Sequence, residues 1–171
     1  MTTLFVVVVM NGCVTKPGMV NNLEKKRHTS RRHIMKTVMV SGHFDPIHDK
    51  HLAYIESALN YGDFLLCIVS TDEQVKQKKG KVNIPEEGRL QLVRLVLQGL
   101  PCSSHAVLNV HDKGTTLVAE ALRYWHPAVF YRGNDKILTD MPLQEAIVCK
   151  ELGIKIIHAE FKGQRHGSEF V

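Results

Sequence analysis

The hydrophobic pattern from residue 35 onward alternates between two periods. Five short and mostly apolar runs have the length and composition of strands that are buried on both faces, at residues 37–41, 64–69, 106–110, 128–131 and 154–158. Segments with helical spacing lie between these runs. Strands that alternate with helices are typical of a parallel sheet that helices cover.

Helical spacing is clearest in two of the intervening segments. Apolar residues three and four positions apart share one helix face, and they recur in this way at Leu52, Ile55 and Leu59 and at Leu90, Val93 and Leu97. The sequence therefore predicts an α/β fold, a Rossmann-like doubly wound sheet of five parallel strands, in a single domain that spans residues 35–171.

Residues that favour helix ends support these boundaries. Pro85, followed by two glutamates, is placed to begin the second amphipathic helix. Pro142 can open a later helix that Gly153 closes. Thr115 or Thr116 can cap the helix before the fourth strand.

The charge of the chain is distributed unevenly. The formal net charge is +5, with 22 Lys and Arg against 17 Asp and Glu. Residues 1–34 hold six of the basic residues and one acidic residue, which accounts for the whole excess. A basic excess can indicate nucleic-acid binding, but here it belongs to a polar, basic leader or linker that we expect to be flexible. No nucleic-acid partner is expected for the balanced remainder.

The leader also contains a short apolar run at residues 4–10. Seven residues are too few to span a bilayer as a helix, and the flanking residues fit a secretory signal or lipoprotein box poorly. Met35 directly precedes the first strand, so residues 1–34 could lie outside the natural protein. The four cysteines show no CxxC spacing or paired framework. We expect a cytoplasmic protein with no membrane partner.

The candidate site directly follows the first strand. Residues 42–51 read Gly-His-Phe-Asp-Pro-Ile-His-Asp-Lys-His, and the first amphipathic helix begins there. His48 and His51 are three positions apart, so both imidazoles can face one side of the helix start. A helix N-terminus favours phosphate, and imidazole N–H groups could stabilise charge that develops on a phosphoryl group.

These ten residues resemble the GxFDxxHxGH signature of the nucleotidyltransferase superfamily, which includes glycerol-3-phosphate cytidylyltransferases and heptose-phosphate adenylyltransferases. Three later motifs resemble that family in the same order along the chain: Ser-Thr-Asp-Glu at residues 70–73, Glu-Gly-Arg at residues 87–89 and Arg-Gly-Asn-Asp at residues 132–135. A lysine-rich loop at residues 76–81 lies between the first two of them.

The resemblance implies transfer of CMP or AMP from CTP or ATP to a phosphorylated alcohol or sugar, with CTP slightly favoured and Mg²⁺ bound to the triphosphate. It implies catalytic roles for His48, His51 and Lys78, and substrate binding by Asp45 and Arg89. The implied nucleotide-binding residues are Gly42, His43, Phe44, Asp45, His48, His51, Arg132, Gly133, Asn134, Asp135 and Ser168. It implies no protein metal ligands, and a homodimer is expected because family members are commonly dimers.

Two departures from the family pattern leave alternatives open. Lys50 stands where the family has Gly, and the final hydroxyl cluster is reduced to residues 167–169. The chain could therefore be a nucleotide-binding protein with impaired catalysis. Residues 131–135 are also similar to the KGGD motif of the heptose-phosphate enzymes, so adenylyl transfer to a sugar phosphate is the other alternative. His43, Asp45, His48 and His51 could instead form a zinc site. The lysine run alone could be a solvated loop, and Arg89 alone a surface helix residue.

Overall fold

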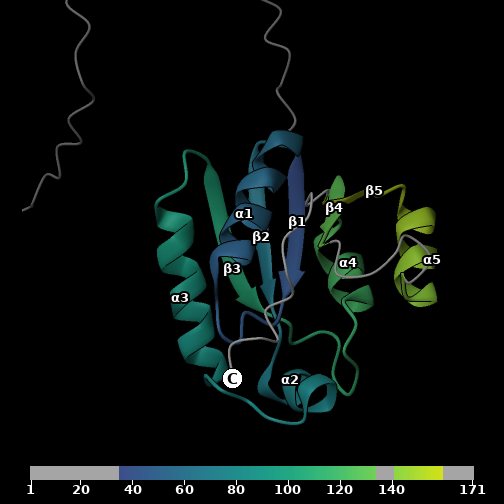
Figure 1. Cartoon of the computed structure of the whole chain (residues 1–171). Helices are drawn as coiled ribbons and strands as arrows, with labels where there is room; N and C mark the ends of the chain where they lie inside the picture. Colours follow the sequence, from purple (N-terminus) through teal and green to yellow (C-terminus); the bar gives the residue numbers. More distant parts are fainter. Residues whose placement is uncertain (1–34, 134–140, 160–171) are drawn as a thin grey trace, which may run out of the picture. The chain divides into compact units, whose positions relative to one another are not determined.

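The computed structural model describes residues 35–133 and 141–159 (Figure 1). In chain order its elements are β1 (Thr37–Gly42), α1 (Asp49–Ala58), the 3₁₀ turn η1 (Leu59–Tyr61), β2 (Phe64–Val69), α2 (Asp72–Lys79), α3 (Glu86–Gln98), β3 (Ser103–Leu108), α4 (Ala119–Trp125), β4 (Val129–Arg132), α5 (Leu143–Leu152) and β5 (Lys155–His158). The predicted leader at residues 1–34 lies outside the described residues.

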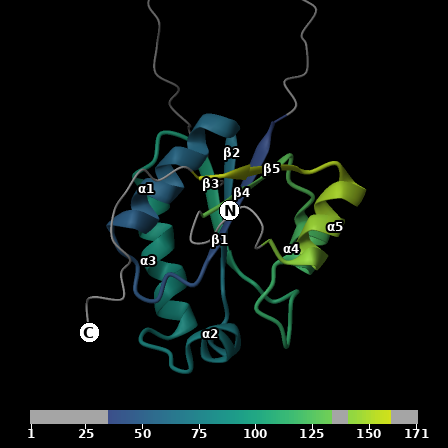
Figure 2. The same ribbon diagram turned by 45° about the vertical axis from the view of Figure 1, so that its right-hand side comes forward.

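The five strands form one parallel sheet in the order β3-β2-β1-β4-β5. β1 lies at the centre of the sheet, β2 and β3 follow on one side of it, and β4 and β5 lie on the other side. This is the doubly wound arrangement that the strand pattern predicts, and it is confirmed. Figure 2 shows α1 and α3 on one face of the sheet, with α4 and α5 on the other.

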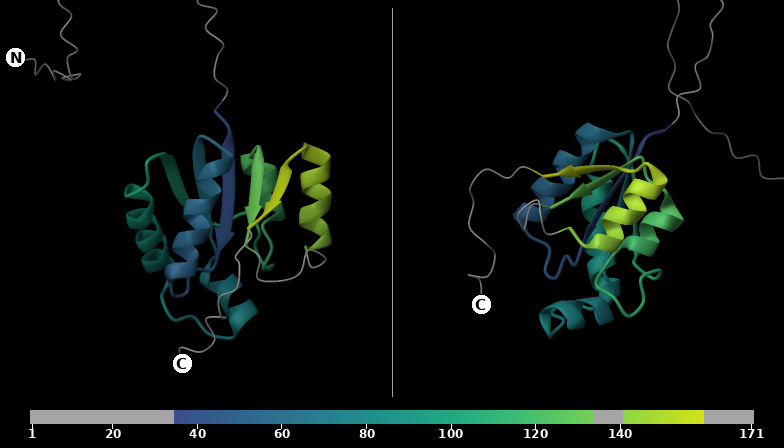
Figure 3. Two further views of the ribbon diagram at one scale, coloured as in Figure 1. Left: turned by 45° about the horizontal axis from the view of Figure 1, so that its top comes forward. Right: turned by 90° about the vertical axis from the view of Figure 1, so that its right-hand side faces the viewer.

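Alternation along the central strands divides the core into two layers, one on each face of the sheet. The right-hand view of Figure 3 shows helices on both sides of the strands. Val38 and Val40 of β1 pack with α1 and α3, whereas Met39 between them packs with α4 and α5. β2 alternates in the same way, and these side chains are fully buried except for Phe64 at its start, which is partly buried. Successive strand residues point to opposite faces, so a strand between two helical layers must be apolar throughout.

The strand expected at residues 106–110 is shifted, because β3 runs from Ser103 to Leu108. β3 lies at one edge of the sheet, and its first residues, Ser103 to His105, are polar and partly or fully exposed. An edge strand does not require a continuous apolar run, so its first half carries no hydrophobic signal.

One expected helix boundary is wrong. Neither Thr115 nor Thr116 caps the helix before β4, which starts at Ala119. Its free N–H groups are satisfied by the carboxylate of Asp112, which accepts hydrogen bonds from the backbone nitrogens of Glu120 at 2.8 Å and Ala121 at 3.0 Å.

The lysine-rich segment is mostly helical rather than a loop. α2 includes residues as far as Lys79 and ends at Gly80, whose φ of 79° is left-handed. Thr71 and Gln74 form a capping box that fixes the start of this helix. No helix in the described part of the chain is long and apolar enough to cross a membrane.

Candidate active site

The turn after β1 lies at the carboxyl end of the sheet, close to α2 in Figure 1. Phe44 within this turn is fully buried and has a φ of 50°. Its ring lies against Gly42, where an added Cβ would stand 2.9 Å from the Phe44 Cζ atom. Glycine at this position therefore allows the turn to fold back over the end of β1.

His48 and His51 lie together at the N-terminus of α1. Their rings stack with centroids 3.8 Å apart. The backbone N–H of His48 donates to Nδ1 of His51 at 3.3 Å. A neutral imidazole that accepts at Nδ1 carries its proton on Nε2, so His51 has an N–H group to donate to a ligand.

Burial keeps His51 neutral at physiological pH. It lowers the pKa of His51 from 6.5 to about 4, and the adjacent imidazole of His48 adds to the shift. His51 can therefore donate a hydrogen bond to a phosphate oxygen without first being a cation. The pairing expected from the His-x-x-His spacing is present in the structure.

His43 forms the second part of the site. Its Nδ1 lies 2.8 Å from Oγ of Ser70, which in turn donates to the carbonyl of Gly42 at 3.3 Å. Burial lowers the pKa of His43 from 6.5 to about 4, with contributions from Lys79, Arg89 and Lys78. Three cationic side chains are thus close enough to influence this imidazole.

Asp45 connects the turn to the segment between α2 and α3. Its side chain accepts hydrogen bonds from the backbone N–H groups of Asn83 at 2.9 Å and Ile84 at 2.8 Å, and the residue is 2% exposed. Lys79 donates to the Asp45 carbonyl at 3.1 Å. In this position Asp45 holds the turn against the segment between α2 and α3. The ligand-binding role predicted for it stays a prediction.

Arg89 also lies beneath the site, with a side chain that is 0% exposed. Its guanidinium donates at 2.7 Å to the carbonyls of His43 and Ser70 and to the carboxylate of Asp72, and at 2.8 Å to the carbonyl of Ile84. It therefore joins the chain segments that follow β1 and β2. This geometry does not present the guanidinium fork to a substrate phosphate, and the substrate-binding role stays a prediction.

The structure relates the remaining residues predicted for the site less directly to the turn. Lys78 lies in the last turn of α2, near enough to lower the pKa of His43. Arg132 ends β4, and Gly133 follows it. Residues 134, 135 and 168, predicted to bind nucleotide, lie outside the described residues.

Sequence reasoning missed three contributors. In the sequence, Ser70 is distinguished only as part of the Ser-Thr-Asp-Glu motif, yet its hydroxyl contacts His43. Lys79 is the lysine that contacts the turn directly. Glu145 of α5 is buried 3.7 Å from Arg132, and nothing in its local pattern distinguishes it from a surface glutamate.

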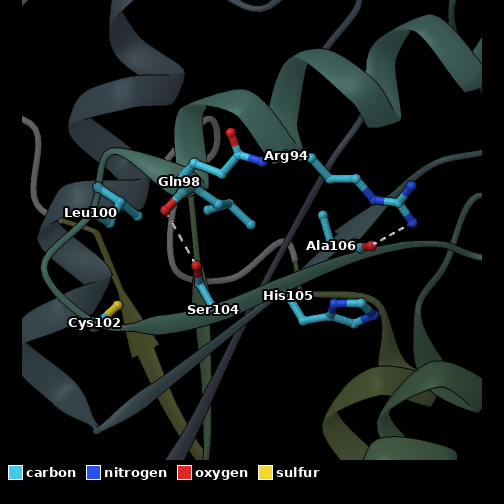
Figure 4. A pocket seen from close by; sticks show the side chains of 8 residues that line it. Arg94, Gln98, Leu100, Cys102, Ser104, His105 and Ala106 are labelled. Atoms are coloured by element: carbon cyan, nitrogen blue, oxygen red, sulfur yellow. Dashed lines mark hydrogen bonds between the residues drawn. The ribbon is translucent and has the colours of Figure 1, made fainter. Parts of the chain in front are cut away.

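A separate cavity of about 360 Å³ lies between α3 and the edge strand β3 (Figure 4). Arg94, Gln98, Cys102, Ser104 and His105 are among its lining residues. They belong to the second half of α3, the connection that follows it and the first half of β3, away from the carboxyl ends of the strands. This cavity contains none of the predicted site residues.

Comparison with known proteins agrees with the fold and with the family resemblance of the sequence. A family model described as cytidylyltransferase-like matches residues 39–167. The FAD synthase of Methanocella arvoryzae is 34% identical over 122 residues, which covers 71% of this chain and 79% of that protein. The FAD synthase of Methanosphaerula palustris is 30% identical over 131 residues, covering 77% and 80% of the two chains.

Two further comparisons extend over different shares of the matched proteins. The bifunctional protein HldE of Pasteurella multocida is 29% identical over 145 residues, which covers 84% of this chain but 29% of that protein. Among solved structures, a lipopolysaccharide core biosynthesis protein from Thermoplasma volcanium matches with a TM-score of 0.56 at 23% identity, over 74% of this chain and 97% of the other. At this identity the structural match shows a common fold.

Proposed function

Because the chain belongs to the cytidylyltransferase-like family, we propose that it transfers a nucleotidyl group from a nucleoside triphosphate to a phosphorylated small molecule and releases pyrophosphate. The observation that carries the proposal is the turn between β1 and α1. There, two stacked imidazoles lie at a helix N-terminus, with lysines of α2 nearby. A helix N-terminus surrounded by N–H donors and cations suits a polyphosphate.

The geometry supports a reaction without a protein nucleophile. A phosphate oxygen of the acceptor attacks the α-phosphorus in line, forming a new P–O bond as the bond to the β-phosphate oxygen breaks. The leaving group is pyrophosphate, and the protein contributes positioning and charge stabilisation. His48 and His51 donate N–H groups to the phosphate oxygens, and Lys78 and Lys79 offset the growing negative charge.

Two buried side chains, those of Arg89 and Asp45, hold the segments that carry these donors in place. Arg89 fixes the carbonyls of His43 and Ser70, and Asp45 fixes the segment that follows α2. Donors that are already ordered need little reorganisation when charge develops during the reaction. Arg132 and Gly133 at the end of β4 border the nucleotide in this arrangement.

Adenylyl transfer is the more strongly supported form of the reaction. The relatives that cover most of both chains are named FAD synthases, and FAD joins a flavin mononucleotide to an AMP unit. We therefore favour ATP over the CTP that the Ser-Thr-Asp-Glu motif suggests. The acceptor is a phosphate monoester such as a flavin mononucleotide or a sugar phosphate.

Mg²⁺ accompanies nucleoside triphosphates and prefers oxygen ligands. In residues 35–133 and 141–159, no group of three or more His, Cys, Asp or Glu side chains is arranged to hold a metal ion. The Asp45 carboxylate is committed to Asn83 and Ile84. The donor set around the turn fits the phosphates rather than a metal, so Mg²⁺ would be held by phosphate oxygens and water.

The cytoplasm is the compartment we propose for this reaction. Cys67, Cys102 and Cys149 are free thiols, and reduced cysteines persist in reducing compartments. A homodimer stays a prediction.

A nucleotide-binding protein without turnover is the second candidate. Lys50 favours it, because it occupies the position where the family motif has glycine, next to His51. Its longer side chain can restrict the approach of a phosphate to the backbone.

A pyrophosphate-release assay separates the two candidates. ATP and CTP are each supplied with Mg²⁺ and a panel containing a flavin mononucleotide, sugar phosphates and phosphorylated alcohols. We expect pyrophosphate with at least one pair, together with a product whose mass includes the nucleotidyl group. Binding of a triphosphate in calorimetry without release across the panel would identify the second candidate instead.

A further inference from the structure

A buried carboxylate beside β4 has no part in the reaction described above. Glu145 lies in the first turn of α5, and its side chain is 6% exposed. It packs where the end of β4, the residue before α4 and the start of α5 meet. A carboxylate in such a position needs partners, because burial of an unpaired charge is strongly unfavourable.

The two oxygens of Glu145 have different surroundings. Oε1 accepts a hydrogen bond from the backbone N–H of Val118 at 3.2 Å. Oε2 is buried and makes no hydrogen bond to any described residue, but it lies 3.7 Å from Nε of Arg132. The first oxygen joins α5 to the start of α4, and the second faces the cation at the end of β4.

The pair is asymmetric in a way that suits ligand binding. Glu145 is almost completely covered, whereas the side chain of Arg132 is 23% exposed. Contact through Nε leaves the two terminal nitrogens of the guanidinium available to a second partner. Those nitrogens form the fork that binds phosphate or other planar acceptors.

We propose that Glu145 is a positioning residue that orients the Arg132 guanidinium toward a bound nucleotide at the carboxyl end of β4. The inference rests on the proposed function, because Arg132 requires this orientation only if a nucleotide binds there. A long side chain that is already ordered loses less conformational freedom on binding, so ligand affinity rises.

Two alternatives to a positioning role predict different effects of removing the Glu145 carboxylate. A purely structural role, through Val118, would change the stability of the fold and leave nucleotide affinity unaltered. A simple charge argument predicts the opposite sign, because removal of a carboxylate near an anionic ligand should tighten binding.

The test compares triphosphate affinity in single and double variants of the full chain. Calorimetry with ATP and with CTP is performed on Glu145→Gln, Arg132→Gln and the double variant, with thermal unfolding to show that each is folded. We expect Glu145→Gln to raise Kd about tenfold, and the double variant to bind as weakly as Arg132→Gln alone. In the pyrophosphate-release assay, Glu145→Gln should raise KM for the nucleotide by a larger factor than it lowers kcat.

Glu151→Gln is the matched control, since Glu151 is on the same helix and pairs with Arg123 at an exposed position. Its affinity should match that of the unchanged protein. Equal or tighter binding by Glu145→Gln, or additive losses in the double variant, would overturn the inference. If the unchanged protein binds neither triphosphate, the proposed function fails and this inference fails with it.

Discussion

Replacement of Arg89 by Met tests whether this residue supports the site from beneath. The substitution retains much of the aliphatic volume but removes the guanidinium. Three backbone carbonyls and the Asp72 carboxylate would lose a donor, each now held at 2.7 or 2.8 Å. The segments after β1 and β2 would lose the bridge that Arg89 forms between the carbonyls of His43 and Ser70.

The magnitude follows from the number and kind of these contacts. A hydrogen bond to a charged group contributes about 1.5–3 kcal/mol, and breaking a buried ion pair costs about 3–5 kcal/mol. Asp72 is 36% exposed and can regain water, so the full sum is not reached. We expect Arg89→Met to lower the free energy of unfolding by about 4 kcal/mol.

Urea unfolding followed by circular dichroism measures this change. Arg94→Met is the control on the same helix, because Arg94 is exposed and makes one hydrogen bond of 3.4 Å to the Ala106 carbonyl. It should cost less than about 1 kcal/mol. Arg89→Lys, which keeps the charge and some of the contacts, provides an intermediate case if Arg89→Met does not fold.

Arg89 would have no such supporting role if the free energy of unfolding of Arg89→Met lies within about 1 kcal/mol of that of the unchanged protein. If that stable variant also binds the phosphorylated acceptor more weakly, Arg89 contacts the substrate directly.

Three further predictions concern the turn and the helix that precedes β4. Gly42→Ala should lower the free energy of unfolding by about 1–3 kcal/mol, since the new Cβ would meet the Phe44 ring at 2.9 Å; an unchanged melting temperature would show that the ring yields freely. His43 and His51 have pKa values of about 4 in the folded protein and 6.5 when unfolded, so stability should be constant above pH 6.5 and fall as the pH drops toward 4. The loss by pH 5 should be roughly 2–4 kcal/mol for the pair after allowance for solvent, and urea titrations at pH 7.5 and 5.0 should show a smaller loss in His51→Gln. Asp112→Ala should cost about 1–2 kcal/mol because two N–H groups of α4 lose their acceptor, and an equal loss from Thr115→Ala would contradict this assignment.

The sequence predicts the central part of the fold well because burial on both faces leaves little choice of residue. The buried middle of β1, Val38 to Val40, and the whole of β2 are apolar, and the pattern shows it. The edge strand β3 has one open side, so its polar start escapes detection. The cap of α4 comes from Asp112, seven residues before the helix, where local spacing gives no indication.

For the candidate site, the sequence predicts which residues come together better than it predicts their contacts. The His-x-x-His motif places two imidazoles at a helix start, and the structure brings them together. The role of Arg89 depends on carbonyls from two separate strand ends, and these meet only in the folded protein. One signal was present in the sequence: Arg89 lies four residues before Val93 and eight before Leu97, on the buried face of α3.

Turnover in the His48→Ala and His51→Ala variants tests the central claim most directly. In the acceptor and triphosphate pair that gives pyrophosphate, each variant should lose roughly 10²–10³ in kcat while triphosphate affinity falls much less, because the imidazoles act on charge that develops in the transition state. His105→Ala, which changes an exposed imidazole on β3, should retain full activity. Unchanged kcat in both site variants would contradict the assignment of this turn as the active site.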